Sequence, residues 1–86
     1  LNAISVFPNP LAGESANISW SQDSHFPVKA ELFDLSGKNL RVLFDERSGS
    51  GYHSKLIDTR DLQAGIYFIR LRTGEETLAR KMLIIK

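Results

Sequence analysis

Two histidines and two nearby aspartates are the side chains of this sequence that could do acid–base or metal chemistry. His25 and His53 each lack a second histidine two or four positions away, the spacing that places two metal ligands on one face of a strand or helix. We expect His25 in a polar loop and His53 on the exposed face of a strand. Asp58 and Asp61 suit the capping of a helical turn better than a calcium site, because calcium takes about six to eight oxygen ligands and few other carboxylates are near.

Other constellations that carry catalysis are missing from the sequence. There is no cysteine, no serine in a G-x-S-x-G elbow, and residues 49–51 lack the Lys-Ser/Thr of a phosphate-binding loop. We therefore expect a protein that is not an enzyme and has no catalytic, metal or cofactor-binding residue.

Length and charge narrow the function further. The 86 residues suffice for one domain, which we place at 1–86, and a domain this small rarely encloses a large pocket. The chain has eleven basic and ten acidic residues, and a net charge so close to zero does not indicate binding to nucleic acid. Residues 70–86 nevertheless carry five basic and two acidic side chains, as a solvated strand face or as a basic docking edge.

The ends of the chain indicate a piece of a larger protein. It does not begin with Met and shows no charged segment followed by an apolar one, as a signal peptide would. Wholly apolar stretches such as residues 82–85 are far shorter than the ~20 residues of a membrane-spanning helix, so we expect no membrane span.

Apolar residues alternate with polar ones in seven short runs, which predicts strands throughout. The runs cover residues 4–7, 16–20, 28–35, 40–44, 52–57, 66–73 and 77–85. Seven strands with turn signals about every ten residues predict an all-β fold, an immunoglobulin-like Greek-key β-sandwich of about seven antiparallel strands. In the fourth run we expect Leu40, Val42 and Phe44 on one face.

Proline, glycine and aspartate mark the predicted turns. Pro8, Asn9 and Pro10 end the first run, because two prolines remove backbone donors. Asp34 and Gly37 predict a hairpin turn, in which the aspartate bonds the backbone two residues on and the glycine adopts positive φ.

Two longer connections are also predicted. Residues 45–51 are expected to form a flexible polar loop. Residues 58–65 are expected to form one helical turn, with Asp58 as N-cap and Gly65 as left-handed exit. Leu62, Gly65 and Tyr67 resemble a tyrosine corner, in which the phenol hydroxyl bonds back to nearby backbone.

The aromatic residues divide into two groups. Trp20 shares a face with Ile18 and Ala16, which favours a core position over a sugar-stacking platform. Phe33 and Phe68 are out of phase with the buried set of their own strands. They belong either to the core of the opposite face or to an exposed docking patch.

Four motifs read in order carry a family resemblance. They are VFPNP at residues 6–10, LFDLSGK at 32–38, DLQAGIYFIRL at 61–71 and KMLIIK at 81–86. Over residues 4–86 the chain resembles a type IX secretion system C-terminal sorting domain.

The resemblance implies a domain at the end of a larger exported protein that directs its cargo through the outer-membrane translocon. It implies a shuttle, a surface sortase that removes the domain, passage through the periplasm, and a final location at the cell surface or outside. The secretion machinery would recognise the last strand and terminal residues: Lys81, Met82, Leu83, Ile84, Ile85 and Lys86. The turn at residues 8–10 and the corner at 65–67 would carry the fold.

Two physical expectations and two rival functions accompany the resemblance. A terminal strand at a sheet edge could pair with a partner by strand addition, and the domain itself is expected to be a monomer or a weak dimer. The first rival is an accessory immunoglobulin-like module that binds polysaccharide or protein through exposed aromatics. The second is a structural spacer or self-assembly domain.

Overall fold

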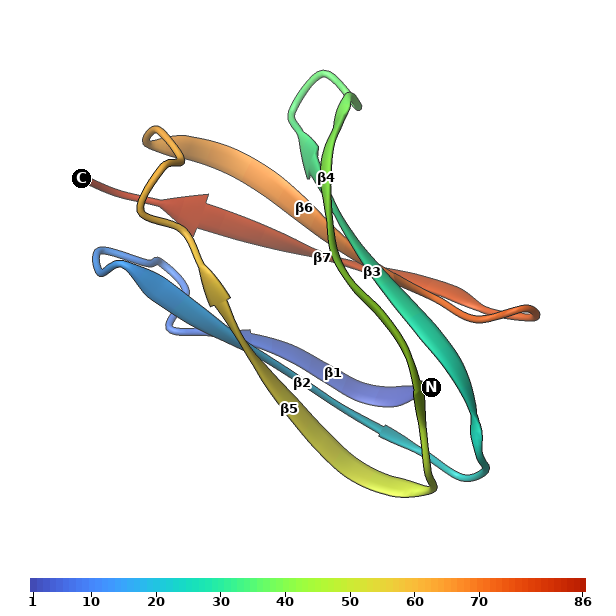
Figure 1. The fold of residues 1–86 in the computed structure, drawn as a ribbon. Helices are drawn as coiled ribbons and strands as arrows, with labels where there is room; N and C mark the ends of the chain where they lie inside the picture. The colour runs from blue at the N-terminus through green and yellow to red at the C-terminus, as the bar shows by residue number, and fades with distance from the viewer.

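The computed structural model describes residues 1–86 as two facing β-sheets without a helix (Figure 1). The strands are β1 (Asn2–Phe7), β2 (Ser15–Gln22), β3 (Phe26–Asp34), β4 (Asn39–Ser48), β5 (Gly51–Asp58), β6 (Gly65–Arg72) and β7 (Thr77–Ile84). One sheet has the order β1-β2-β5 and the other the order β4-β3-β6-β7, with every pair antiparallel. The predicted seven-stranded all-β sandwich is confirmed, while its immunoglobulin-like Greek-key character stays a prediction.

A single apolar core lies between the sheets. It contains 17 buried apolar side chains, and every strand except β4 contributes at least one. The alternation predicted for β2, β3 and β6 is confirmed, because the inward positions of these strands are buried while most of their neighbours are not. Strand periodicity of two residues therefore determines which side chains fill the core.

Trp20 is the largest side chain of this core and is fully buried, as predicted. Its ring stacks on Phe44 at a centroid distance of 5.3 Å and on His53 at 5.4 Å. The indole N–H donates to Gln22 Oε1 at 2.8 Å, and the Gln22 amide donates to the Ser48 carbonyl at 2.9 Å. The prediction that His53 faces solvent is wrong, because His53 pairs with Trp20 across β2 and β5 and so faces inward.

Two predictions about β4 are also wrong. Strand pairing shifts between Ala30 and Glu31, so Phe44 is opposite inward-facing Ala30 whereas Val42 is opposite outward-facing Glu31. This bulge breaks the alternation, and Leu40, Val42 and Phe44 do not share one face. Residues 45–48 are not a loop either, because β4 continues to Ser48 and only residues 49 and 50 separate it from β5.

The helical turn predicted for residues 58–65 is absent. The segment crosses from one sheet to the other and contains a tight turn, in which the Leu62 N–H donates to the Thr59 carbonyl at 3.1 Å. Asp58 caps no helix; its carboxylate accepts from the Arg60 N–H at 3.0 Å. Gly65 has φ +156°, far from the left-handed helical value, so its predicted role as exit residue is wrong. The bond from Leu62 to Thr59 spans three residues, so the segment makes one tight turn and not a turn of α-helix.

One carboxylate is buried outside the core. Glu31 lies on the outer face of the four-stranded sheet, where Arg70 donates to it at 2.8 Å and Asn39 at 2.8 Å. Arg72 adds an ion pair at 3.6 Å. The hydrogen bond from Arg70 is the main reason why the pKa of Glu31 is lowered below its ordinary value of 4.5.

We predict that Glu31→Gln destabilises the domain near neutral pH and much less in acid. A lowered folded-state pKa means that the ionised group contributes stability above pH 4.5, and that this contribution is lost as the pH falls through the folded value. Because both arginines are partly exposed, the expected loss in unfolding free energy at about pH 7 is ~1–2 kcal/mol. Urea denaturation at about pH 7 and about pH 3 measures it, and an equal loss at both values would contradict the prediction.

Candidate recognition surface at the carboxyl-terminal strand

The outer edge of β7 is closed by the turn that follows β1. The Asn9 side chain donates to the Lys81 carbonyl at 2.8 Å and accepts from the Leu83 N–H at 3.0 Å. Leu11 continues the pairing, since its N–H donates to the Leu83 carbonyl and its carbonyl accepts from the Ile85 N–H, both at 2.8 Å. Asn9 thus takes the place of a peptide group, and the backbone edge at residues 81, 83 and 85 is not free for strand addition.

The six terminal residues predicted for recognition divide into two groups. Met82 and Ile84 point into the core and are fully buried. Lys81 and Ile85 are exposed and Leu83 is half-buried. Only the side chains of this second group, together with that of Lys86, are open to a partner from outside.

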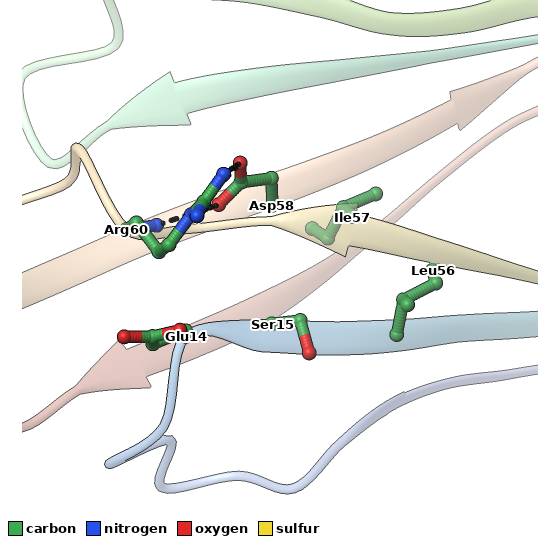
Figure 2. Close-up of a pocket in the computed structure, with 6 residues that line it drawn as sticks. All are labelled: Glu14, Ser15, Leu56, Ile57, Asp58 and Arg60. Atoms are coloured by element: carbon green, nitrogen blue, oxygen red, sulfur yellow. Dashed lines mark hydrogen bonds and ion pairs between the residues drawn. The ribbon is translucent and has the colours of Figure 1, made fainter.

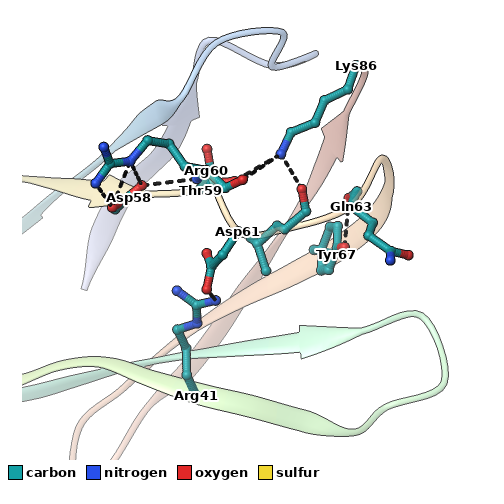
Figure 3. A network of polar contacts seen from close by, with 9 residues as sticks. Arg41, Asp58, Thr59, Arg60, Asp61, Gln63, Tyr67 and Lys86 are labelled. Carbon is teal, nitrogen blue, oxygen red and sulfur yellow. Dashed lines mark hydrogen bonds and ion pairs between the residues drawn. The ribbon is translucent and has the colours of Figure 1, made fainter.

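Lys86 anchors the loop at residues 59–64 that connects β5 with β6 on the other sheet, which we call the crossing loop. Its ammonium group donates to the carbonyls of Thr59 at 3.3 Å, Arg60 at 3.2 Å, and Leu62 (Figure 3). An ammonium group has three donors and can therefore bond several carbonyls of one loop at once. The terminal residue therefore connects the end of β7 with a segment that lies more than 20 positions earlier.

Two further contacts hold the same loop in Figure 3. The Tyr67 hydroxyl donates to the Gln63 carbonyl at 2.8 Å, which confirms the bond expected of a tyrosine corner. Arg41 on β4 forms an ion pair with Asp61 at 2.7 Å. Leu62, which lies between Asp61 and Gln63 in the sequence, is buried in the core. The loop is thus fixed from β4, β6 and the terminal residue at once.

The predicted hairpin turn after β3 is confirmed. Asp34 Oδ1 accepts from the Ser36 N–H at 2.9 Å and from the Lys38 N–H at 3.0 Å. The Ser36 hydroxyl also donates to this oxygen, and these bonds hold the pKa of Asp34 below its usual value. Gly37 has φ +90°, which a residue with a Cβ rarely adopts.

A hollow of about 310 Å³ lies between the start of β2 and the end of β5 (Figure 2). Asp58 and Arg60 line it and bind each other through three guanidinium contacts, the shortest at 2.8 Å. This pairing lowers the pKa of Asp58 to about 2. Because the two charges neutralise each other, we assign no function to this hollow.

The structure groups residues that the sequence separates by more than 70 positions. The turn at residues 8–10 was predicted only as a strand end, and its bonds to β7 were missed. An asparagine between two prolines is the signal that could have indicated it, because its amide is the one polar group in that turn able to replace a strand. Trp20, proposed as a sugar platform in the rival view, is buried.

Comparison with known proteins identifies the family. A family model described as "Secretion system C-terminal sorting domain" matches residues 5–86. The chain belongs to this family, and it is a C-terminal sorting signal of the type IX secretion system. No curated protein matches the chain.

This membership has direct consequences for location. A type IX sorting domain takes part in secretion to the cell surface or the exterior, and it acts on a cargo in the same chain. The binding-module alternative is not favoured. The structure contains no helix that could span a membrane.

We predict that Asn9→Ala destabilises the domain by about 1–2 kcal/mol, because two hydrogen bonds of ordinary strength are lost. The exchange of the Leu83 amide hydrogen should also accelerate, since that N–H loses its acceptor. Urea denaturation and hydrogen exchange followed by NMR measure the two effects.

Asn2→Ala serves as the control, because the Asn2 side chain makes no hydrogen bond. Asn9→Asp keeps the acceptor for Leu83 but loses the donor to Lys81, so its Leu83 amide should stay protected while stability still falls. Unchanged exchange at Leu83 in Asn9→Ala would contradict the pairing.

We predict that Lys86→Met frees the crossing loop. The substitution keeps the aliphatic stem and removes the three donors, so trypsin should cut after Arg60 several-fold faster, in line with an opening cost lower by ~1 kcal/mol. Lys81→Met is the matched control, because the Lys81 ammonium forms no ion pair. Equal cleavage rates after Arg60 in both variants would refute the anchoring role.

Proposed function

We propose that this chain is the non-catalytic sorting signal of a larger exported protein. In this proposal the domain passes through the periplasm together with its cargo. The outer-membrane translocon and its shuttle recognise it in the folded state, and a surface sortase then removes it. Family membership supports the general role. The compact core supports folded-state reading, because it keeps the surface the same whichever cargo precedes it.

The observation that carries the proposal is the division of the terminal residues. Lys81, Leu83, Ile85 and Lys86 keep accessible side chains, while Met82 and Ile84 fix their positions from inside the core. We therefore propose that the secretion machinery recognises the accessible side chains of these four residues. The backbone of β7 between residues 81 and 85 is already bonded, which argues against recognition by strand addition.

We predict that fusing residues 1–86 behind an exported fluorescent reporter sends the reporter outside a host that has the type IX system. The measurement is the fraction of fluorescence at the surface or in the medium against that in the periplasm. The same fusion in a strain without the translocon is the control. A fusion that stays in the periplasm like the reporter alone would overturn the proposal.

The deletion of residues 83–86 from this fusion should abolish export. It also removes buried Ile84 and the Lys86 anchor, so loss of export alone would not separate recognition from folding. Ile85→Ser separates them, because that side chain is 47% exposed and its backbone bond to Leu11 does not depend on it. We expect reduced export with an unchanged urea midpoint. Full export of Ile85→Ser would contradict reading of this side chain.

A further inference from the structure

The outer face of the four-stranded sheet carries an aromatic pair that the core does not use. Phe33 on β3 and Phe68 on β6 are directly opposite each other and are half-buried, so the exposed-patch alternative of the sequence is the one that the structure supports. Leu35, 66% exposed, extends this apolar surface into the hairpin turn. Ala79 on β7 completes it.

These residues border a shallow hollow of about 270 Å³, which we call the outer hollow. It is smaller than the ~300–1,000 Å³ typical of small-molecule pockets. Its walls are mostly apolar, and it lies open on the surface of a rigid sheet. This size and shape suit one or two side chains of a protein segment that lies across the strands.

Basic side chains outnumber acidic ones around the outer hollow, whose lining also includes Asp34, an aspartate bonded within its own turn. The Arg70 guanidinium lies 4.5 Å from the Phe33 ring centroid, and Glu31 fixes it there. Arg70 and Arg72 share this single carboxylate, so one positive charge of the pair is not neutralised by it. Lys81 is opposite Phe68 on β7 and has no acidic partner. Three of the five basic residues noted in residues 70–86 thus lie on this face, while Arg80 bonds the Ile4 carbonyl and Lys86 bonds the crossing loop.

We propose that the outer hollow docks an acidic protein segment that inserts an apolar side chain between Phe33 and Phe68. Its carboxylates pair with Arg70 and Lys81. Charge complementarity selects this occupant, because Arg70, Arg72 and Lys81 outnumber Glu31 and Asp34 around the apolar site, and a net positive charge attracts acidic segments. The inference rests on the proposed function, in which this segment belongs to the secretion machinery, and it adds Phe33, Phe68 and Arg70 to the recognition surface.

The opposite face of the sandwich lacks this combination. Tyr52 and Leu56 are strongly exposed there, but four of the six residues that line the hollow beside Leu56 are polar or charged. The neighbouring hollow at the end of β5 has its arginine bound to Asp58. Tyr52 is therefore suited as a control position for an exposed aromatic outside the site.

The test uses charge and ring changes in the exported reporter fusion. Phe68→Thr and Lys81→Glu should each lower export about tenfold, whereas Lys81→Arg should keep export within about twofold of the unchanged fusion. Arg47→Glu, an equal charge change at the far end of β4, and Tyr52→Thr should also leave export within about twofold. Urea midpoints of the 86-residue variants show whether each one is folded. We leave Arg70 unchanged, since its loss would strip Glu31 of its partner.

A photoreactive benzophenone amino acid in place of Phe68 identifies the occupant. We expect a crosslink to an Asp- or Glu-rich segment of the secretion machinery, located by mass spectrometry. A crosslink to a second copy of the chain, to a polysaccharide, or to a segment without acidic residues would overturn the inference.

The two proposals fail in different ways. If the unchanged fusion is not exported, the proposed function is wrong. If it is exported and folded Phe68→Thr and Lys81→Glu are exported equally well, only the outer hollow is wrong as a docking site.

Discussion

The backbone along the free edge of β7 needs partners, and the turn after β1 supplies them. A sheet edge presents unpaired N–H and C=O groups that would otherwise pair with another chain. Asn9 and Leu11 provide four hydrogen bonds to residues 81–85, and Leu11 is itself fully buried. The first and last motifs of the sequence are therefore one structural unit, so that neither can change without affecting the other.

This closure decides how the domain can be recognised. With the backbone edge at residues 81–85 occupied, what this part of β7 offers a partner is the side chains that alternate outward from a fixed strand. Their spacing exists only in the folded domain, because Met82 and Ile84 hold them from within. A fixed surface of this kind is what the proposed function requires, because it does not depend on the cargo that precedes it.

The crossing loop is likewise held by contacts from residues that are distant in the sequence. Lys86, Tyr67 and Arg41 reach it from three different elements, and Leu62 inserts into the core beneath them. The loop is short and has few internal hydrogen bonds, so its carbonyls accept from side chains instead. The terminal lysine is in this way part of the fold as well as a candidate for recognition.

Local patterns were sufficient to predict the strands, their inward residues and the hairpin at Asp34 and Gly37, because these depend on a two-residue period and on turn geometry. They were insufficient wherever a distant partner intervened. The bulge in β4 places Phe44 on the other face from Val42, His53 stacks on Trp20 and so faces inward, and the segment after Asp58 forms a tight turn in place of the predicted helical one.

The sequence by itself determined that this chain is an all-β sorting domain. Both the alternation of apolar with polar residues and the four motifs depend only on the order of the residues. Only the tertiary structure decided which groups meet: Asn9 with β7, Lys86 with the crossing loop, and Phe33 with Phe68 beside Arg70. The physical reason is that a hydrogen bond or ring contact depends on position in space. Residues as far apart as these, from 24 to 74 positions, leave no periodic trace of such a contact in the sequence.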